Sequence, residues 1–173
     1  MREILFRGKR VDTGEWVEGY YFKATHHWHK HGVHEDWIAV DSVQNGGWCN
    51  VYRKYAIVPE TLGQFTGLTD NNGKRIFWGD IVRVKGSESD ENWKDYDEIG
   101  KVVFVDGAFL IEVPQEYNGM KYYSKIHSHY MTTADWVTRE VIGNIHDNGE
   151  RLFDIAENKI AHHPTEKGGA RND

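Results

Sequence analysis

Closely spaced turn signals between short β-favouring runs constrain the fold of this chain more than any other feature. The segment KVVFVDGAFLIEV (101–113) contains two such runs joined by Asp106-Gly107, a pair that suits a two-residue hairpin turn with positive φ. Asn71-Asn72-Gly73 marks another turn ahead of the alternating run at 81–84. Because such runs recur and helix signals are few, the sequence predicts an all-β sandwich or small barrel with little helix.

The chain divides into three regions of different character. Residues 3–22 contain two β-favouring arms around the turn DTGE, which predicts an N-terminal β-hairpin. We assign residues 1–66 to an N-terminal β region with a His-rich loop, and residues 67–150 to a β-barrel core. Residues 151–173 lose apolar content, which predicts a flexible C-terminal tail.

Three segments interrupt the strand pattern. Residues 87–98 (SESDENWKDYDE) predict an acidic loop between two strands, and residues 115–131 predict a long aromatic loop. Residues 133–141 (TADWVTREV) favour one or two helical turns. We therefore expect long loops on a small β scaffold.

The composition limits the compartment and the class of partner. A net charge of −6, without any run of Lys or Arg, argues against a nucleic-acid-binding surface. Cys49 is the single cysteine, so an intrachain disulfide and a thiolate zinc site are excluded, and a reducing cytoplasm fits. No segment reaches the roughly 18 apolar residues of a membrane span. We expect a soluble, cytoplasmic protein without membrane contact.

Three motifs together resemble a known protein family. The central string IVPETLGQFTGLTDNNGKRIFWGDIV (57–82) follows MREILFRGK at the N-terminus and precedes EVIGNIHDN (140–148). Their order is similar to that of the YopX-like family of phage and prophage proteins, over residues 1–10 and 55–150. The resemblance implies a phage or prophage origin, a host bacterial cytoplasm, an SH3-like barrel or roll, and no established activity.

Four residues of the central string predict turn structure. Asp70 and Gly73 flank the Asn71-Asn72 pair, where Gly73 can take positive φ without penalty. Gly79 and Asp80 precede the next strand, and Asp80 can accept backbone N–H groups in that turn. The alternative hypothesis is that Asp70 and Asp80 approach each other as paired carboxylates or cation ligands.

The His-rich stretch THHWHKHGVHED (25–36) is a candidate metal site. His27, His29 and His31 share one face if the stretch is extended, and His27, His31 and His34 share one if it is helical. Three imidazoles with Glu35 nearby could bind zinc or nickel. The spacing matches no familiar metal motif, so we predict a solvated loop, no physiological cofactor, and adventitious binding of zinc or nickel.

Aromatic and basic residues supply the candidate binding groups. No Gly-x-Ser-x-Gly elbow, phosphate-binding loop or dinucleotide fingerprint is present, so we expect no enzymatic activity. Exposed aromatic side chains can anchor a partner or stack on a base, and arginine can hold phosphate. The candidate ligand- or partner-binding residues are Trp78, Trp93, Tyr96, Arg75 and Arg83.

These features are compatible with three alternative functions. The first is a non-enzymatic phage accessory protein that binds a host or phage macromolecule through loops on a β scaffold. The second is a small-ligand or nucleotide-binding protein that sequesters its ligand. The third is a metal-dependent hydrolase centred on the histidine cluster. We rank them in this order and expect a homo-oligomer, because open strand edges favour self-association.

Overall fold

The computed structural model describes residues 3–26, 33–40, 53–88, 94–117, 120–126 and 137–149. Most of these residues, 71%, lie in antiparallel strands and 8% in helix, which confirms the predicted all-β class with little helix. Within the described ranges, two short helical segments accompany the strands, η1 (Pro59–Thr61) and α1 (Ile145–Asn148). An open barrel or roll is compatible with this arrangement.

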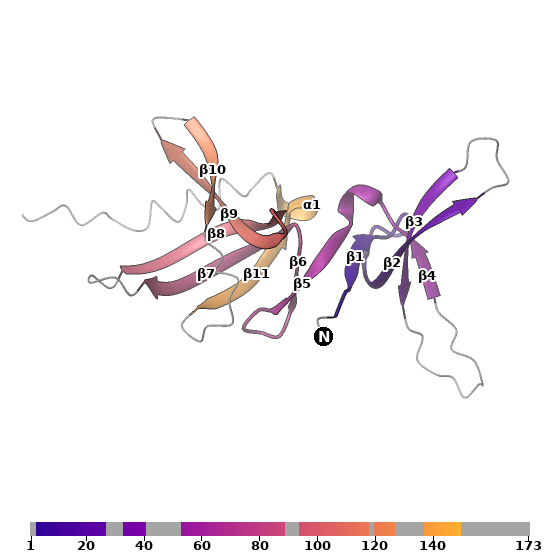
Figure 1. Cartoon of the computed structure of the whole chain (residues 1–173), viewed down its shortest axis with the longest axis horizontal. Coiled ribbons are helices and arrows are strands. Elements are labelled where there is room, and N and C mark those ends of the chain that lie inside the picture. The colour runs from indigo at the N-terminus through magenta and orange to yellow at the C-terminus, as the bar shows by residue number, and fades with distance from the viewer. Residues whose placement is uncertain are drawn as a thin grey trace, which may run out of the picture.

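The strands form two antiparallel sheets that lie side by side, with β5 and β6 between them (Figure 1). The first has the order β4-β3-β2-β1-β5-β6, and the second the order β10-β9-β8-β7-β11. The first sheet consists of β1 (Phe6–Lys9), β2 (Trp16–His26), β3 (Val33–Val40), β4 (Arg53–Ala56), β5 (Gly63–Thr69) and β6 (Arg75–Phe77). The second consists of β7 (Asp80–Glu88), β8 (Lys94–Val105), β9 (Ala108–Tyr117), β10 (Met120–Ile126) and β11 (Thr138–Asn144).

The four N-terminal strands curl so that the ends of β1 and β4 meet. Arg10 and Ile57 form an isolated antiparallel bridge, and the amide of Val58 donates to the carbonyl of Lys9 at 2.8 Å. Ile57 is buried inside this curl. Gly8 permits the close packing, because a Cβ on it would lie 2.8 Å from Ile57 Cδ1. The N-terminal strands thus form a small roll.

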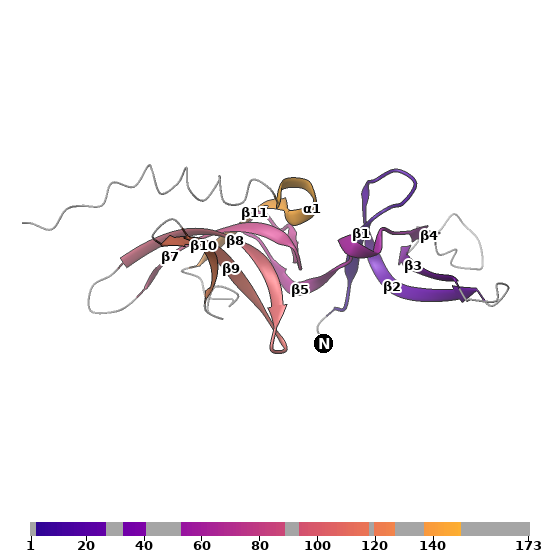
Figure 2. The same cartoon turned by 90° about the horizontal axis from the view of Figure 1, so that it is seen from above.

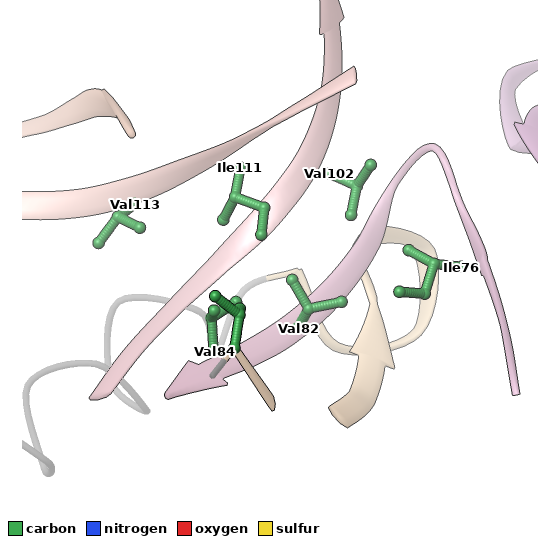
Figure 3. Packing of buried hydrophobic residues seen from close by; sticks show 7 residues of the cluster. Ile76, Val82, Val84, Val102, Ile111 and Val113 are labelled. Carbon is green, nitrogen blue, oxygen red and sulfur yellow. The ribbon is translucent and has the colours of Figure 1, made fainter. Parts of the chain in front are cut away.

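The main hydrophobic core lies on one face of the second sheet and is completed by the first (Figure 3). Ile76 comes from β6 of the first sheet, while the other members come from the second sheet and Val137. Burying each of these β-branched side chains contributes about 1.5–3 kcal/mol. The core consists of Ile76, Val82, Val84, Val102, Ile111, Val113 and Val137. This shared core packs β6 against the second sheet.

The predicted hairpins are present where the turn chemistry is strongest. β8 and β9 pair directly across Asp106 (φ 52°) and Gly107 (φ 82°). This hairpin projects from the sheet in the view from above (Figure 2). β1 and β2 form the predicted N-terminal hairpin, in which Gly14 has a φ of 71°.

Three predictions about irregular segments were wrong. Residues 138–141 of the expected helical segment lie in strand β11 (Thr138–Asn144), because the pairing with β7 outweighs local helix propensity, and residues 133–136 lie outside the described residues. Most of the expected acidic loop continues β7 and β8, which pair as far as Glu88 and Lys94. The expected aromatic loop contains the end of β9 and all of β10.

The expected boundary between residues 66 and 67 falls inside β5, which pairs with β1 of the first sheet. The predicted tail at 151–173 lies outside the described residues. Within the described part of the chain, no helix has the length and apolar character needed to cross a bilayer.

Candidate functional site

Three segments that are far apart in the sequence meet in a buried junction between the two sheets. Asp80, at the start of β7, is only 1% exposed and forms an ion pair with Arg7 of β1. Asp80 also accepts hydrogen bonds from the backbone N–H of Phe77 at 2.8 Å and from Nδ2 of Asn144 at 3.4 Å. The junction therefore joins the first strand, the turn before β7 and the end of β11.

Aromatic rings enclose the cation of this junction. The guanidinium carbon of Arg7 lies 4.7 Å from the ring centroids of both Trp16 and Phe77. A desolvated cation between two rings is stabilised by their quadrupoles. Burial raises the pKa of Asp80 above its usual value, and the charge of Arg7 opposes that rise. Because both groups are enclosed and paired, the junction holds the sheets together.

A second polar layer covers the junction on its exposed side. Asp147 of α1 pairs with Lys9 and accepts a hydrogen bond from Trp16 Nε1 at 2.9 Å. His146 packs its ring against Trp16, with centroids 6.2 Å apart. Burial lowers the pKa of His146, and the nearby charges of Lys9 and Arg7 lower it further. The short helix α1 thereby ties the second sheet to β1 and β2.

The predicted turn around Asp70 covers the edge of the second sheet. Asp70 Oδ1 accepts from the amides of Asn72 and Lys74, at 2.8 and 2.9 Å, and Oδ2 accepts from Val141 of β11 at 3.1 Å. Asn71 forms two hydrogen bonds with the backbone of Arg139. Its side-chain Oδ1 accepts from the Arg139 backbone N–H at 2.6 Å, and its backbone N–H donates to the Arg139 carbonyl at 3.0 Å. These bonds occupy backbone groups that an edge strand would otherwise expose.

Asp70 and Asp80 therefore have separate environments. They share no hydrogen-bond partner among the described residues. Gly73 (φ 80°) and Gly79 (φ 82°) both have positive φ, as a turn requires. No group of three or more His, Cys, Asp or Glu side chains in the described ranges could hold a metal ion. The geometry matches the turn interpretation of these four residues.

A polar hollow lies beside the Asp70 turn, and we define it by its lining. On the face of the second sheet opposite the core, Lys85 of β7 stands directly opposite Thr138 of β11, and Arg83 opposite Glu140. The hollow has a volume of about 300 Å³. Its lining consists of Asn71, Asn72, Arg83, Lys85, Thr138, Arg139 and Glu140.

Two cationic side chains, Arg83 and Lys85, and the carboxylate of Glu140 lie on the face of the hollow, whereas Arg139 stands opposite Val84 on the core face. Arg83 is fixed by Asp97, which accepts from its Nε at 2.9 Å and from its Nη2 at 2.6 Å and raises its pKa. Burial lowers the pKa of Arg139, whose side chain is largely removed from water. The hollow thus combines the cations of Arg83 and Lys85 with the carboxylates of Asp97 and Glu140, and the Thr138 hydroxyl donates to the Lys85 carbonyl at 3.4 Å.

An aromatic face on the first sheet is the second surface of interest. Tyr20 and Phe22 alternate on β2 and are 49% and 37% exposed. Trp37 of β3 stands directly opposite Phe22, and the Nζ of Lys54 of β4 lies 4.6 Å from the Trp37 ring centroid. We call Tyr20, Phe22 and Trp37 the aromatic face.

The predicted binding residues that the structure describes do not lie together. Arg83 lines the hollow, whereas Tyr96 lies on the opposite side of the sheet against the hydrophobic core. Arg75 lies on the first sheet, where it pairs with Glu18 at 3.2 Å. Trp78 is half-buried in the turn between β6 and β7.

The remaining predicted residues are largely beyond the structural description. Trp93, His27, His29 and His31 lie outside the described residues, and His34 is placed on β3 by its backbone pairing with Thr25. The metal hypothesis for the histidine cluster stays a prediction.

Sequence reasoning missed both surfaces defined above. The alternation of Tyr20 and Phe22 along a strand was the available signal for the aromatic face. The hollow had no local signal, because Asn72, Lys85 and Thr138 come from three separate segments.

Comparison with known proteins places the chain in one family. The model of the family described as YopX protein matches residues 5–153. No curated protein and no solved structure matches the chain. The buried junction is built from the motifs that resembled this family, since Arg7, Asp80 and Asn144 each belong to one of the three.

Proposed function

We propose that this chain, which belongs to the YopX family, is a non-enzymatic binding module that acts on a host or phage protein. The observation that carries the proposal is the aromatic face on β2 and β3. Tyr20 and Phe22 are exposed next to each other, although aromatic side chains of this size stabilise a fold by being buried.

The arrangement of the aromatic face is typical of a protein contact. Tyr, Trp and Phe are enriched in the buried centres of protein interfaces, where a few anchors supply most of the affinity. Phe22 and Trp37 stand opposite each other, Ala39 stands opposite Tyr20 and Ala56 opposite Trp37, so small residues flank the rings. A partner side chain can pack beside the rings, over these alanines, and remove the ring surfaces from water.

Charge favours a protein over a nucleic acid as the partner. The chain carries a net charge of −6, and the exposed Glu18 precedes Tyr20 on the same side of β2. Phosphate backbones are bound by surfaces with an excess of Lys and Arg. An acidic surface repels phosphate groups, whereas it does not repel a protein partner with an apolar contact surface.

A paired set of variants tests the proposal. Tyr20→Ser with Phe22→Ser removes the exposed rings, and Ile4→Ser with Val11→Ser removes exposed apolar residues that lie outside the aromatic face. We expect a partner from a lysate of the source bacterium to be retained by the wild type and by the control, and lost from the first variant.

Equal retention by both variants, or no partner retained by the wild type, would contradict the proposal. Light scattering on the same samples reports the subunit number. If the wild type is an oligomer and only the aromatic-face variant dissociates, the aromatic face binds a second copy of the chain in place of a foreign protein. The expected homo-oligomer is a prediction that the same measurement addresses.

A further inference from the structure

We propose that the aromatic face binds a positively charged side chain, lysine or arginine, of the partner protein, and that Lys54 competes with it for the Trp37 ring. This inference rests on the proposed function and specifies the chemistry of the partner. The observation that carries it is an ammonium group on the aromatic face, since the Nζ of Lys54 lies 4.6 Å from the centroid of the Trp37 ring.

Strand pairing arranges the side chains around the aromatic face in two rows across β2, β3 and β4. Side chains alternate along a strand, so residues two apart on one strand belong to neighbouring rows on the same side of the sheet. Ala39 lies at the centre of its row, with Tyr20 on one side and Lys54 on the other. The first row consists of Phe22, Trp37 and Ala56, and the second of Tyr20, Ala39 and Lys54.

The rings favour a cation over a neutral or acidic side chain. The face of an aromatic ring carries negative potential, and among the aromatic residues Trp attracts a cation most strongly. Tyr20 and Phe22 are 49% and 37% exposed, so both rings present surface to a partner. Lysine and arginine also have long apolar stems, which can pack over Ala39 while the charged end contacts a ring.

Carboxylates border the aromatic face on two strands. Glu18 on β2 and Glu35 on β3 each lie two residues before a ring of the face, so both are on the same side of the sheet as the rings. Arg75 is shared between Glu18 and Glu3, at 3.2 and 3.6 Å. Together with Lys54, these described groups comprise three carboxylates and two cations. The local charge therefore has the same sign as the net charge of −6 and attracts a basic partner.

Lys54 is a cation that a partner can displace. Its side chain is exposed, and a lysine ammonium is carried on a flexible four-carbon stem. A cation–π contact at an exposed site is weak, so little free energy opposes its replacement. While Lys54 lies on the Trp37 ring, it covers part of the ring and repels an incoming cation. Removal of the Lys54 charge should therefore strengthen the binding of a basic side chain.

Peptide probes that differ at one position test the charge preference of the full chain by NMR. The probes share one short Gly-Ser sequence with blocked ends, and the central residue is lysine, norleucine or glutamate. Norleucine has the apolar stem of lysine without the charge. We expect the lysine peptide to shift the Ala39 amide and the Trp37 indole N–H, with a Kd about threefold lower than that of the norleucine peptide, as for one exposed cation–π contact. The glutamate peptide should cause no shift.

Lys54→Gln is the variant that tests the competition. It should bind the lysine peptide about threefold more tightly than the wild type does, because the competing cation is gone. Lys85→Gln is the matched control, since it makes the same change in net charge at an exposed lysine of the second sheet. The control should bind the lysine peptide as the wild type does. The combined Tyr20→Ser and Phe22→Ser variant should bind it more weakly.

Three results would overturn the inference: equal binding of the lysine and norleucine peptides, tighter binding of the glutamate peptide, or binding by Lys54→Gln no tighter than by Lys85→Gln. Failure of the proposed function is distinguishable from these results. A lysate partner that depends on the aromatic face, combined with no preference for lysine, contradicts this inference alone. Selective binding of the lysine peptide, with no protein retained from the lysate, contradicts the proposed function and supports the chemistry of the face.

Discussion

Arg7 and Asp80 form a buried ion pair across 73 residues of sequence, and this pair lies where the two sheets meet. Asn144 hydrogen-bonds the same carboxylate from the end of β11. Each residue belongs to one of the three motifs that resemble the YopX-like family. The motifs therefore describe an architectural junction, and the surfaces available for binding lie elsewhere on the molecule.

Replacing Asp80 with Asn should destabilise the fold strongly. The variant keeps the shape of the side chain but leaves the Arg7 guanidinium buried without a counter-charge. Removing one partner of a buried pair costs about 3–5 kcal/mol. Urea denaturation of the variant and the wild type measures the difference in the free energy of unfolding.

Asp12→Asn is the matched control, because Asp12 pairs with Arg10 at an exposed site. Water screens an exposed pair, so this variant should unfold almost as the wild type does. A comparable loss of unfolding free energy in the two variants would show that the buried pair stabilises the fold no more than an exposed pair.

Replacing Asp70 with Ala should open the edge of the second sheet. The variant loses acceptors for the amides of Asn72, Lys74 and Val141. Leaving such donors without a partner costs about 1–3 kcal/mol. Hydrogen exchange of the Val141 amide should accelerate by more than the loss of global stability explains. Unchanged protection of that amide would contradict the capping role, and Asp106→Asn, which tolerates positive φ, serves as the neutral control.

His146 should make stability depend on mildly acidic pH. Burial and the charges of Lys9 and Arg7 lower its folded-state pKa below 6.5, while Asp147 and Glu60 oppose this. At a pH between the folded-state and unfolded-state pKa values, the unfolded chain therefore binds a proton at His146 more readily than the folded chain does. The stability contributed by neutral His146 is complete above pH 6.5 and is lost as the pH falls from 6.5 towards the folded-state value.

Denaturant unfolding between pH 8 and pH 5 measures this dependence. The wild type should lose more stability over the range than His146→Gln, which cannot take up the proton. The pKa of Asp147 is lowered below 3.8, so its own contribution is lost only at more acidic pH. Parallel pH profiles for the two proteins would contradict the prediction.

Gly100→Ala should disturb the main core. A Cβ on Gly100 would lie 2.6 Å from Ile111 Cγ2 and 2.7 Å from the Glu112 carbonyl oxygen. Overpacking of this kind costs about 1–3 kcal/mol, measurable by thermal or urea unfolding. At Gly149 the nearest atom would be 3.8 Å away and the backbone is helical, so Gly149→Ala should change stability by less than about 0.5 kcal/mol. Similar losses at both positions would contradict this packing account.

Local turn chemistry explains which parts of the fold were predictable. Asp106-Gly107 and Gly73 are turn residues whose conformation depends on near neighbours, so their hairpins could be read directly from the sequence. The strands at 94–98 and 120–126 were taken for loops, because they contain mainly polar residues and tyrosines and lack an apolar run. Their pairing depends on partners that the local pattern does not reveal.

Long-range contact explains which parts of the site were not predictable. Arg83 was predicted as a binding residue and lines the hollow. Asn72, Lys85 and Thr138 come together with it only because β11 pairs with β7. Asp80 was assigned to a turn from its neighbours, while its ion pair with Arg7 follows from the docking of β1. Such contacts need the tertiary structure.

Site-specific photo-crosslinking tests the proposed binding function most directly. A photoreactive residue at position 22 lies on the aromatic face, and one at position 11 lies at a more exposed turn away from it. After irradiation with lysate, the account predicts one discrete protein adduct from position 22 and none from position 11. Adducts of equal pattern from both positions, or none from position 22, would contradict the claim that the aromatic face binds a protein.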